Sequence, residues 1–479
     1  MRYSVLIYLT RMADTLLEAI EYLKGSETPE LREELLENGR QMLSRMKDVL
    51  VSHADDLKNH LPLERLNKLE FTWVSAEEKP EVETLLREWK GKLSEEVHYQ
   101  VRAVFFAELG EKWDAMESVY AYMRDDPRFD PVVVLTPVFR IVKQADGTTK
   151  QDVIYKDYLT QLGIPFLGYD DYDIEKDCPE LAFTSQPYES CTLPQFWAEN
   201  IAKYTRLVYL PYFLPNYITK MHIESLCRLP IYNYAWFVPG NNEKHQAYYK
   251  KHSRHNGANM LLTGLPKADP MVMLKDRKIK LPTKWKKLSG KKVFLWNSWY
   301  DATASSQCYF DTIIEYFRTH EDCALIWRPH PMTDTVTKLY HPEKYNQYLE
   351  RIKKVDSMPN AVMDREVSCE AAFYYSDAQI SDFSSLMSQY LFLDKPLLWV
   401  KNHRFEMTGE ELIDSVWMEK TWDAQGIVDF LERTRRGEDR NSQLREQVKQ
   451  YDLAWSDGKC GERLCNLLFR KLHEEDSII

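Results

Sequence analysis

Short, uniformly apolar runs alternate with amphipathic stretches along most of this 479-residue chain, and this alternation constrains its fold more than any other feature. Runs that are apolar throughout indicate strands buried on both faces, and the stretches between them indicate helices that cover a parallel sheet. The first series predicts strands at 101–106, 131–135, 164–167, 181–183, 206–210 and 234–238, with helices at 113–123 and 152–162 among them. This pattern is typical of an α/β fold with a doubly wound sheet.

The alternation stops at residues 266–291, which are rich in Pro, Lys and Asp and form the best linker candidate in the chain. It then resumes, with predicted strands at 292–296, 323–328, 361–363, 378–380 and 397–400. We therefore predict two Rossmann-like units, at 100–265 and at 292–479, the second with a helical tail. Two such units place a cleft between the carboxyl ends of their sheets.

Residues 1–99 differ from the rest in being rich in Glu, Lys, Leu and Met. Their apolar residues recur at helical spacing, as the series Leu36, Leu43, Met46, Leu50 and Leu57 illustrates. We expect a helical extension here. Two interpretations stay open for it: a packing extension of the next unit, or a contact surface for a membrane, a partner or a second copy of the chain.

Composition excludes some classes of function. With 63 Lys and Arg against 74 Asp and Glu, the net charge is −11, which argues against a nucleic-acid binder. The apolar run near the start, Val5–Leu9, is too short for a signal peptide or a membrane helix. The eight cysteines include no C-x-x-C pair and are expected to be reduced thiols. We predict a cytoplasmic protein, with peripheral contact to the inner membrane face left open.

No metal site is legible in the sequence. His245, His252 and His255 are seven and three residues apart in a Lys-rich helix, without a carboxylate at a fixed spacing. They are interpreted as a solvated helix face and not as a set of metal ligands. The motifs of P-loop nucleotide binders, zinc proteases and serine hydrolases are also absent.

Two segments carry the residue types that bind phosphate. A predicted strand ends in Arg328-Pro329-His330-Pro331, where Arg328 can pair with a phosphate and His330 can donate or transfer a proton. Another strand ends in Ser381-Asp382, and Ser384 and Ser385 then open a helix whose first N–H groups could hold a phosphate. A Ser or Asp at such a place is often just a helix cap, and from the local pattern alone this alternative is favoured.

Two further segments remain ambiguous. Residues 263–269, Thr-Gly-Leu-Pro-Lys-Ala-Asp, end the first unit and either line the cleft or form a turn. Residues 295–301 follow the first strand of the second unit, and their small polar and aromatic side chains, Ser298 among them, would suit the edge of a nucleotide.

These motifs together resemble the CDP-glycerol glycerophosphotransferase family, which includes teichoic acid primases and polymerases. The resemblance rests on the motif at 328–331, on Ile-Ser-Asp-Phe-Ser-Ser at 380–385 followed by Asp-Lys-Pro at 394–396, and on the segment 263–269. It covers roughly residues 100–400 and is strongest in the second half. It implies a GT-B-like fold and transfer of glycerol phosphate from CDP-glycerol to an acceptor hydroxyl, with release of CMP.

By position, the resemblance implies that Arg328 and His330 contact the donor phosphates, that Ser384 and Ser385 hold the pyrophosphate, and that Asp382 orders their loop. His330 is then the catalytic candidate, and Ser298 a further donor contact. The resemblance makes 292–479 the nucleotide-donor unit and 100–265 the acceptor unit. The implied partners are a nucleotide-activated donor and a polyol or glycan acceptor, for which a lipid-linked form stays open. No cofactor is implied, and a divalent ion on the pyrophosphate has no support in the sequence.

The sequence departs from the family pattern at two places. The Trp-His-Gly motif of the first unit, whose His is the family's general base, is absent, and His222 is a weak substitute. The usual Pro-Thr-Trp-Arg is replaced by Asn-Ser-Trp-Tyr at 297–300. Two alternatives therefore stay open: a GT-B glycosyltransferase that uses a nucleoside diphosphate sugar, and a non-catalytic relative that binds nucleotide or a partner.

Overall fold

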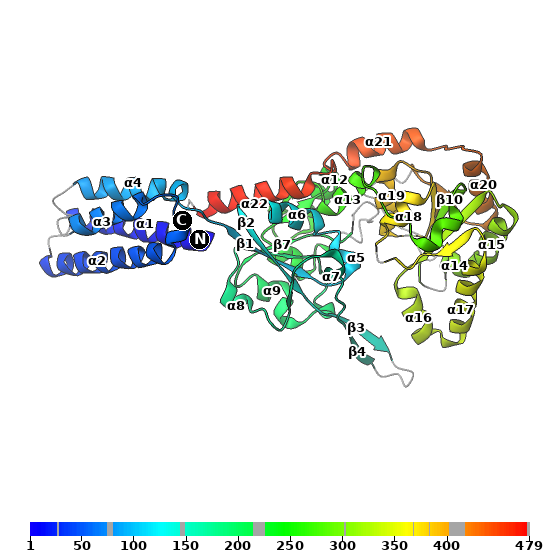
Figure 1. The fold of residues 1–479 in the computed structure, drawn as a ribbon, viewed down its shortest axis with the longest axis horizontal. Helices are drawn as coiled ribbons and strands as arrows, with labels where there is room; N and C mark the ends of the chain where they lie inside the picture. The colour runs from blue at the N-terminus through cyan, green and yellow to red at the C-terminus, as the bar shows by residue number, and fades with distance from the viewer. Residues whose placement is uncertain are drawn as a thin grey trace.

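The computed structural model describes residues 1–25, 28–73, 80–143, 149–213, 226–300, 303–366, 368–382, 384–401 and 417–476. Three parts follow one another along an elongated molecule: a helical bundle, a first α/β unit and a second α/β unit (Figure 1). The predicted fold class, two doubly wound α/β units with an N-terminal helical extension, is confirmed.

The bundle consists of α1 (Tyr3–Gly25), α2 (Pro29–Ser52), α3 (Leu61–Thr72) and α4 (Pro80–Glu96). Its apolar stripes meet in a core that continues into the core of the first sheet. The indole N–H of Trp73 donates to the carbonyl oxygen of Leu36 at 2.9 Å, and its ring lies where a Cβ on Gly39 would stand. The bundle thus packs as an extension of the first unit, while a role in contacting a membrane or a partner stays a prediction.

The first sheet is parallel with the order β5-β2-β1-β6-β7. Its strands are β1 (Val101–Ala107), β2 (Phe129–Leu135), β5 (Leu167–Gly168), β6 (Leu181–Thr184) and β7 (Arg206–Tyr209). A bridge from Val208 to Phe237 connects it to the pair β8 (Val238–Gly240) and β9 (Met260–Leu262). The accompanying helices include α5 (Gly110–Trp113), α6 (Glu117–Asp125), α8 (Ile174–Asp177), α9 (Ala198–Ile201), α11 (Pro230–Tyr234) and α12 (Glu243–His252).

Three predictions for this unit are wrong, and the strand predicted at 164–167 is shifted to β5 (Leu167–Gly168). The helix predicted at 152–162 is replaced by the hairpin of β3 (Val138–Lys143) and β4 (Thr149–Ile154), followed by the short helix α7 (Leu159–Leu162). The sequence Asp146-Gly147 is a hairpin signal that the helix prediction passed over. The strand predicted at 234–238 is wrong in its start: α11 ends at Tyr234, and β8 begins only at Val238. The helix predicted at 113–123 is broken at residues 114–116, between α5 and α6.

The second sheet has six parallel strands in the order β12-β11-β10-β13-β14-β15. These are β10 (Lys292–Ser298), β11 (Cys323–Pro329), β12 (Ala361–Met363), β13 (Ala378–Ser381), β14 (Leu397–Val400) and β15 (Glu419–Thr421). Counted along the chain, the order is 3-2-1-4-5-6, that of dinucleotide-binding domains, which bind ligands where the winding reverses. Here that point lies between β10 and β13. The first five strands were predicted, and β15 was not.

Helices cover both faces of this sheet. They are α14 (Ser305–Cys308), α15 (Phe310–Thr319), α16 (Met332–Tyr340), α17 (Pro342–Ser357), α18 (Glu370–Tyr375), α19 (Ser385–Tyr390), α20 (Ala424–Arg435) and α21 (Ser442–Asp452). Separate apolar clusters line the two faces, and buried tryptophans dominate both: Trp296 and Trp327 on one side, Trp285, Trp399 and Trp417 on the other. Much of the aromatic content of the chain therefore fills cores.

The segment predicted as a linker is packed along its length. Its short helices at 266–275 and 283–288 bury Met271, Leu274 and Trp285 against the second sheet. Asp269 accepts hydrogen bonds from the backbone N–H groups of Cys460 and Gly461, at 2.9 and 2.8 Å. The segment is thus tied to the start of the last helix.

That last helix, α22 (Cys460–Asp476), leaves the second unit and packs on the first (Figure 1). The sequence predicts the whole helical tail as part of the second unit. This is wrong for α22, which packs on the first unit. Leu464, Leu468 and Leu472 recur every four residues, and this stripe is buried in the core shared by the bundle and the first sheet.

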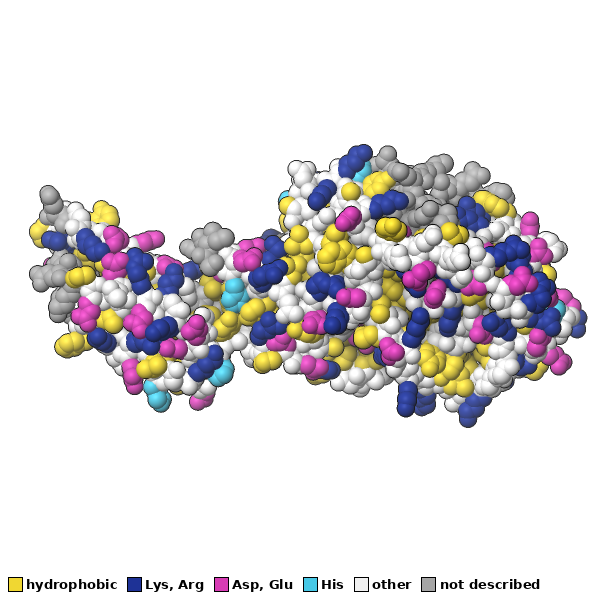
Figure 2. All heavy atoms as spheres, turned by 90° about the horizontal axis from the view of Figure 1, so that it is seen from above, with side chains coloured by type: hydrophobic (Ala, Val, Ile, Leu, Met, Phe, Trp, Pro, Cys, Tyr) yellow, Lys and Arg dark blue, Asp and Glu magenta, His cyan; other side chains and the backbone are white. Residues whose placement is uncertain are grey.

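The surface carries mixed charge. Figure 2 shows Lys and Arg side chains interspersed with Asp and Glu over the visible face. Within the described ranges, no helix combines the length and apolarity that a membrane span needs.

His245 contradicts the prediction of a solvated face for the three histidines. His255 is exposed, but His245 is buried within α12, and its Nδ1 has no hydrogen-bond partner among the described residues. Burial lowers the pKa of His245 to about 4. The imidazole is therefore a neutral core group.

His245 should make the fold sensitive to acid. The unfolded chain binds a proton at this side chain below about pH 6.5 and the folded chain only near pH 4, so stability is present above that range and lost as the pH falls through it. We expect wild-type protein to lose roughly 2 to 3 kcal/mol more than His245→Gln between pH 7 and pH 4. Urea unfolding at several pH values measures this difference, and parallel pH profiles would contradict it.

Candidate functional site

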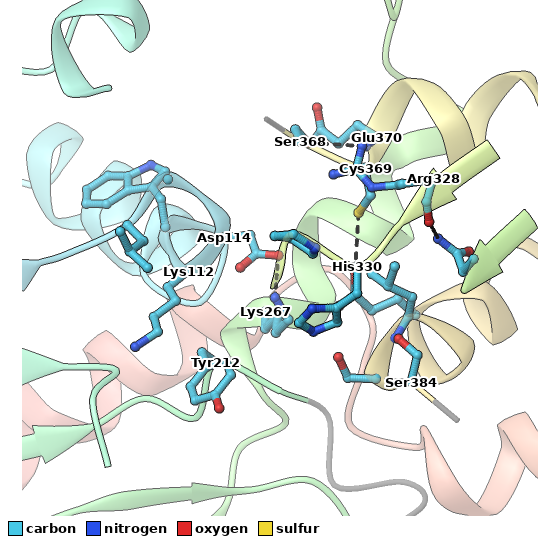
Figure 3. A pocket seen from close by; sticks show the side chains of 18 of the residues that line it. Lys112, Asp114, Tyr212, Lys267, Arg328, His330, Ser368, Cys369, Glu370 and Ser384 are labelled. Atoms are coloured by element: carbon cyan, nitrogen blue, oxygen red, sulfur yellow. Dashed lines mark hydrogen bonds and ion pairs between the residues drawn. The ribbon is translucent and has the colours of Figure 1, made fainter. Parts of the chain in front are cut away.

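A cavity of about 440 Å³ lies between the two α/β units, at the carboxyl ends of both sheets. The first unit contributes Lys112, Asp114 and Tyr212, and the second contributes Arg328, His330, Ser368, Cys369, Glu370 and Ser384 (Figure 3). Lys267, from the segment between the units, lies between the two walls. The cavity includes the reversal point of the second sheet, where ligands of such sheets bind.

His330 projects into the cavity from the end of β11 with a fixed orientation. Its ring centroid lies 4.8 Å from those of both Trp299 and Tyr300. The backbone N–H of Met332 donates to its Nδ1 at 3.1 Å. Because Nδ1 accepts this bond, the proton of the neutral imidazole is on Nε2. His330 is therefore set up as a hydrogen-bond donor through Nε2.

Arg328 lines the cavity and also forms a buried ion pair. Its Nη1 donates to Asp364 Oδ2 at 2.5 Å and to the carbonyl oxygen of Glu366 at 3.1 Å. The side chain of Asp364 is fully buried. Arg328 thus fixes the chain after β12 as well as contributing positive charge to the cavity wall.

Asp382 is the anchor of the loop that follows β10. Its carboxylate accepts from the N–H of Trp299 at 2.7 Å and from the N–H of Ser305 at 3.1 and 3.0 Å. The residue is buried. Asp382 therefore acts on the neighbouring loop and holds Trp299 beside His330, whereas the sequence had linked it only to its own loop.

The two serines after Asp382 face the cavity from the start of α19. Ser384 caps this helix, because its Oγ accepts from the N–H of Leu386 at 3.2 Å. Ser385 is exposed. Ser298 also lines the cavity, but it is buried and its Oγ accepts from the indole of Trp327 at 3.4 Å. Ser298 therefore contributes to packing of the wall as well.

His222, the weak candidate for the missing histidine, lies outside the described residues. Of the sequence-predicted site residues, Arg328, His330, Ser384, Ser385 and Ser298 line one cavity, and Asp382 supports it.

The wall from the first unit was missed by sequence reasoning. The ammonium of Lys112 lies 4.9 Å from the ring centroid of Tyr212 and pairs with Glu108 at 2.7 Å. Burial raises the pKa of Glu108 above its ordinary value, although Lys112 opposes the shift. Asp114 and Lys267 form a second ion pair, with Lys267 only 3% exposed. No local motif marks Lys112 or Asp114, and only Lys267 stood in a segment that the sequence singled out.

Metal ligands are not grouped in the part of the chain that the structure describes: no three His, Cys, Asp or Glu side chains there are placed to hold one ion.

Comparison with solved structures shows the fold. The wall teichoic acid polymerase TagF superimposes with a TM-score of 0.52 over 87% of this chain and 99% of its own, at 12% identity. UDP-GlcNAc 2-epimerase from Neisseria meningitidis, bound to UDP-GlcNAc, gives a TM-score of 0.51 over 77% of this chain and all of its own, at 10% identity. The predicted GT-B fold is thereby confirmed.

Comparison of sequences shows the family. No curated protein sequence matches significantly. A family model described as CDP-glycerol:poly(glycerophosphate) glycerophosphotransferase matches residues 221–470, just over half of the chain, including the motifs at 328–331 and 380–385. The chain belongs to the CDP-glycerol:poly(glycerophosphate) glycerophosphotransferase family.

Proposed function

We propose that this protein transfers glycerol phosphate from CDP-glycerol to an acceptor hydroxyl on a cell-surface polymer precursor, with release of CMP. The observation that carries the proposal is the convergence of Arg328, His330, Ser384 and Ser385 on one cavity at the reversal point of the second sheet, in a chain of this family. The protein would act in the cytoplasm, at the inner face of the membrane where a lipid-linked precursor is presented.

The second unit supplies the groups that a nucleoside diphosphate donor needs. The positive charge of Arg328 and the Nε2–H of His330 face the place where phosphate oxygens would lie, and the start of α19 adds backbone N–H groups and the Ser385 hydroxyl. In the transfer, the acceptor oxygen bonds to the glycerol-linked phosphorus. The bond from that phosphorus to the bridging oxygen breaks, and CMP leaves with that oxygen.

Positioning and charge neutralisation supply most of the rate in such a phosphoryl transfer. His330 donates its Nε2–H to an oxygen on which negative charge increases, and it needs no rearrangement to do so because Met332 and the two aromatic rings already hold it. Within the described residues, the acceptor side is the wall of Lys112, Asp114 and Tyr212.

Calorimetric titration of the purified protein with CMP, CDP-glycerol, UDP and a UDP-sugar tests the donor assignment. We expect cytidine-selective binding that weakens about tenfold in His330→Ala. Selectivity for uridine would replace the proposal with a glycosyltransferase. Binding of none of the four would favour a non-catalytic relative.

The serine pair gives a second test. Ser384→Ala with Ser385→Ala removes two hydroxyls from the proposed pyrophosphate site and one helix cap. We expect transfer to fall roughly 10- to 100-fold and stability to fall by about 1 kcal/mol. Initial rates of CMP release and a urea unfolding curve measure the two effects. A well-folded double variant with wild-type rates would remove the pyrophosphate assignment.

A further inference from the structure

Asp114 lines the cavity but is not among the residues that we propose to contact the donor. It occupies the break between α5 and α6, and its Oδ2 pairs with the Nζ of Lys267. Its Oδ1 is buried and has no hydrogen-bond partner among the described residues. In Figure 3, Asp114 and Lys267 lie across the cavity from Ser384, with His330 beside Lys267. A carboxylate with one oxygen fixed and the other unpaired can accept one further proton donor.

The transfer needs a group that takes the proton of the acceptor hydroxyl, and His330 is not suited to it. A base must present a lone pair to the acceptor. The Nδ1 lone pair of His330 already accepts the N–H of Met332, and its Nε2 carries the proton. The family's histidine motif is absent from this chain.

The other carboxylates of the cavity are less suited than Asp114. Glu370 pairs with Arg277 at 2.6 Å. Glu117 makes no hydrogen bond with a described residue, so nothing there fixes its carboxylate. Glu108 is nearly fully buried and pairs with both Lys112 and Gln186. Asp114 alone combines a fixed position with an unpaired oxygen in the described part of the cavity.

We propose that Asp114 is the catalytic base of the transfer: its Oδ1 takes the proton of the acceptor hydroxyl as the acceptor oxygen bonds to the glycerol-linked phosphorus. The proposal rests on the proposed function. Lys267 is a positioning residue that holds Oδ2, so that Oδ1 is the oxygen left to accept the proton. The proton passes from the acceptor oxygen to Asp114 and then to solvent, while CMP leaves with the bridging oxygen.

The charges around Asp114 are consistent with this task. Three groups face Asp114 from other elements: Lys267 from the segment between the units, Glu117 from α6 and Cys369 from the start of α18. Lys112 lies on α5, which ends directly before Asp114 in the chain, and Arg277 and Glu370 lie beyond Glu117. Burial raises the pKa of Asp114 above its ordinary value, against the opposite effects of Lys267 and, to a smaller extent, of the backbone N–H of Ala115. The carboxylate is thereby a stronger base than an exposed aspartate.

The test measures CMP release by the full chain with CDP-glycerol and a short synthetic poly(glycerol phosphate) primer, and, separately, calorimetric binding of CDP-glycerol. We expect Asp114→Asn to lower kcat about 100- to 1,000-fold and to leave the Kd of CDP-glycerol within about twofold. Asp114→Glu should recover part of the loss. Asp125→Asn, an exposed carboxylate at the end of α6, is the matched control and should keep wild-type rates.

The pH dependence separates catalysis from a structural effect. Lys267→Met removes the cation that favours the ionised carboxylate, so the acidic limb of the kcat profile should move to higher pH. Asp114→Asn leaves Lys267 buried without its carboxylate, and if it fails to fold, Asp114→Asn with Lys267→Met removes both charges and should fold and stay inactive.

Three outcomes overturn the proposal. A folded Asp114→Asn variant within fivefold of the wild-type rate would show that Asp114 is not the base. An acidic limb that disappears in His222→Ala and persists in Asp114→Asn would assign the proton to His222. A wild-type chain that binds no CDP-glycerol would remove the proposed function and this proposal together, whereas the first two outcomes leave the proposed function intact.

Discussion

Replacing His330 by alanine is expected to lower the rate of glycerol-phosphate transfer by about 100- to 1,000-fold while the protein stays folded. The variant loses the Nε2–H that we propose to contact the donor phosphates, and Met332 loses a hydrogen-bond acceptor at the start of α16. In our proposal this N–H stabilises negative charge that develops in the transition state, and losing one hydrogen-bond donor of that kind lowers rates by this amount in other enzymes. Single-turnover rates of CMP release at saturating CDP-glycerol give the size of the effect.

His341→Ala is the control for this prediction. His341 belongs to the same unit, but its side chain is 42% exposed and contacts Glu343 at the surface. We expect a rate within twofold of wild type. A His330→Ala variant that binds CDP-glycerol and transfers at a tenth of the wild-type rate or better would contradict a role for His330 in the transfer step.

The largest effect on stability is expected from Asp382→Asn. The carboxylate holds two backbone N–H groups of the loop after β10, and an amide presents one acceptor oxygen and an NH2 group in its place. Charged hydrogen bonds of this kind contribute about 1.5 to 3 kcal/mol each, so we expect a loss of about 2 to 4 kcal/mol and a lower unfolding midpoint. Transfer should also fall, because the loop carries Trp299, which packs on His330.

Asp429→Asn is the matched control for this variant. Asp429 is exposed on α20 and accepts only a surface hydrogen bond from Gln425, so we expect a change below about 0.5 kcal/mol. Urea unfolding followed by tryptophan fluorescence measures both variants. An Asp382→Asn protein that unfolds at the wild-type urea concentration would show that the loop does not depend on the charge.

The strands of the second unit, except β15, could be predicted from the sequence. The strand at 323–329 begins as an apolar run, and the strand at 378–381 is a shorter one with Gln379 in it. Residues at or just after the ends of both strands line the cavity. The site residues Arg328, His330 and Ser384 are therefore local to strand ends, where a parallel sheet places its ligands. The prediction succeeds here because each site residue lies within a few residues of the apolar strand pattern that positions it.

The cavity wall that the first unit contributes could not be predicted in this way. Asp114 faces the cavity because a helix predicted as continuous breaks at residues 114–116, and Lys267 reaches it from 153 positions along the chain. The pairing of these two charges depends on tertiary packing. The same holds for α22, whose apolar stripe could be seen in the sequence but whose partner, the first core, could not.

The tie between Asp269 and the start of α22 has a mechanical consequence. The chain passes between the two units twice, near Asp269 and again before Cys460, and the two crossings are fastened to each other. Gly264, with φ of +74°, lies so close to the carbonyl oxygen of Trp455 that no side chain would fit there. Any change of angle between the units must therefore turn about this single pivot. Lys267 is two residues from it, so opening of the cleft would move the wall that the second unit contributes while the Asp114–Lys267 pair stays together near the axis.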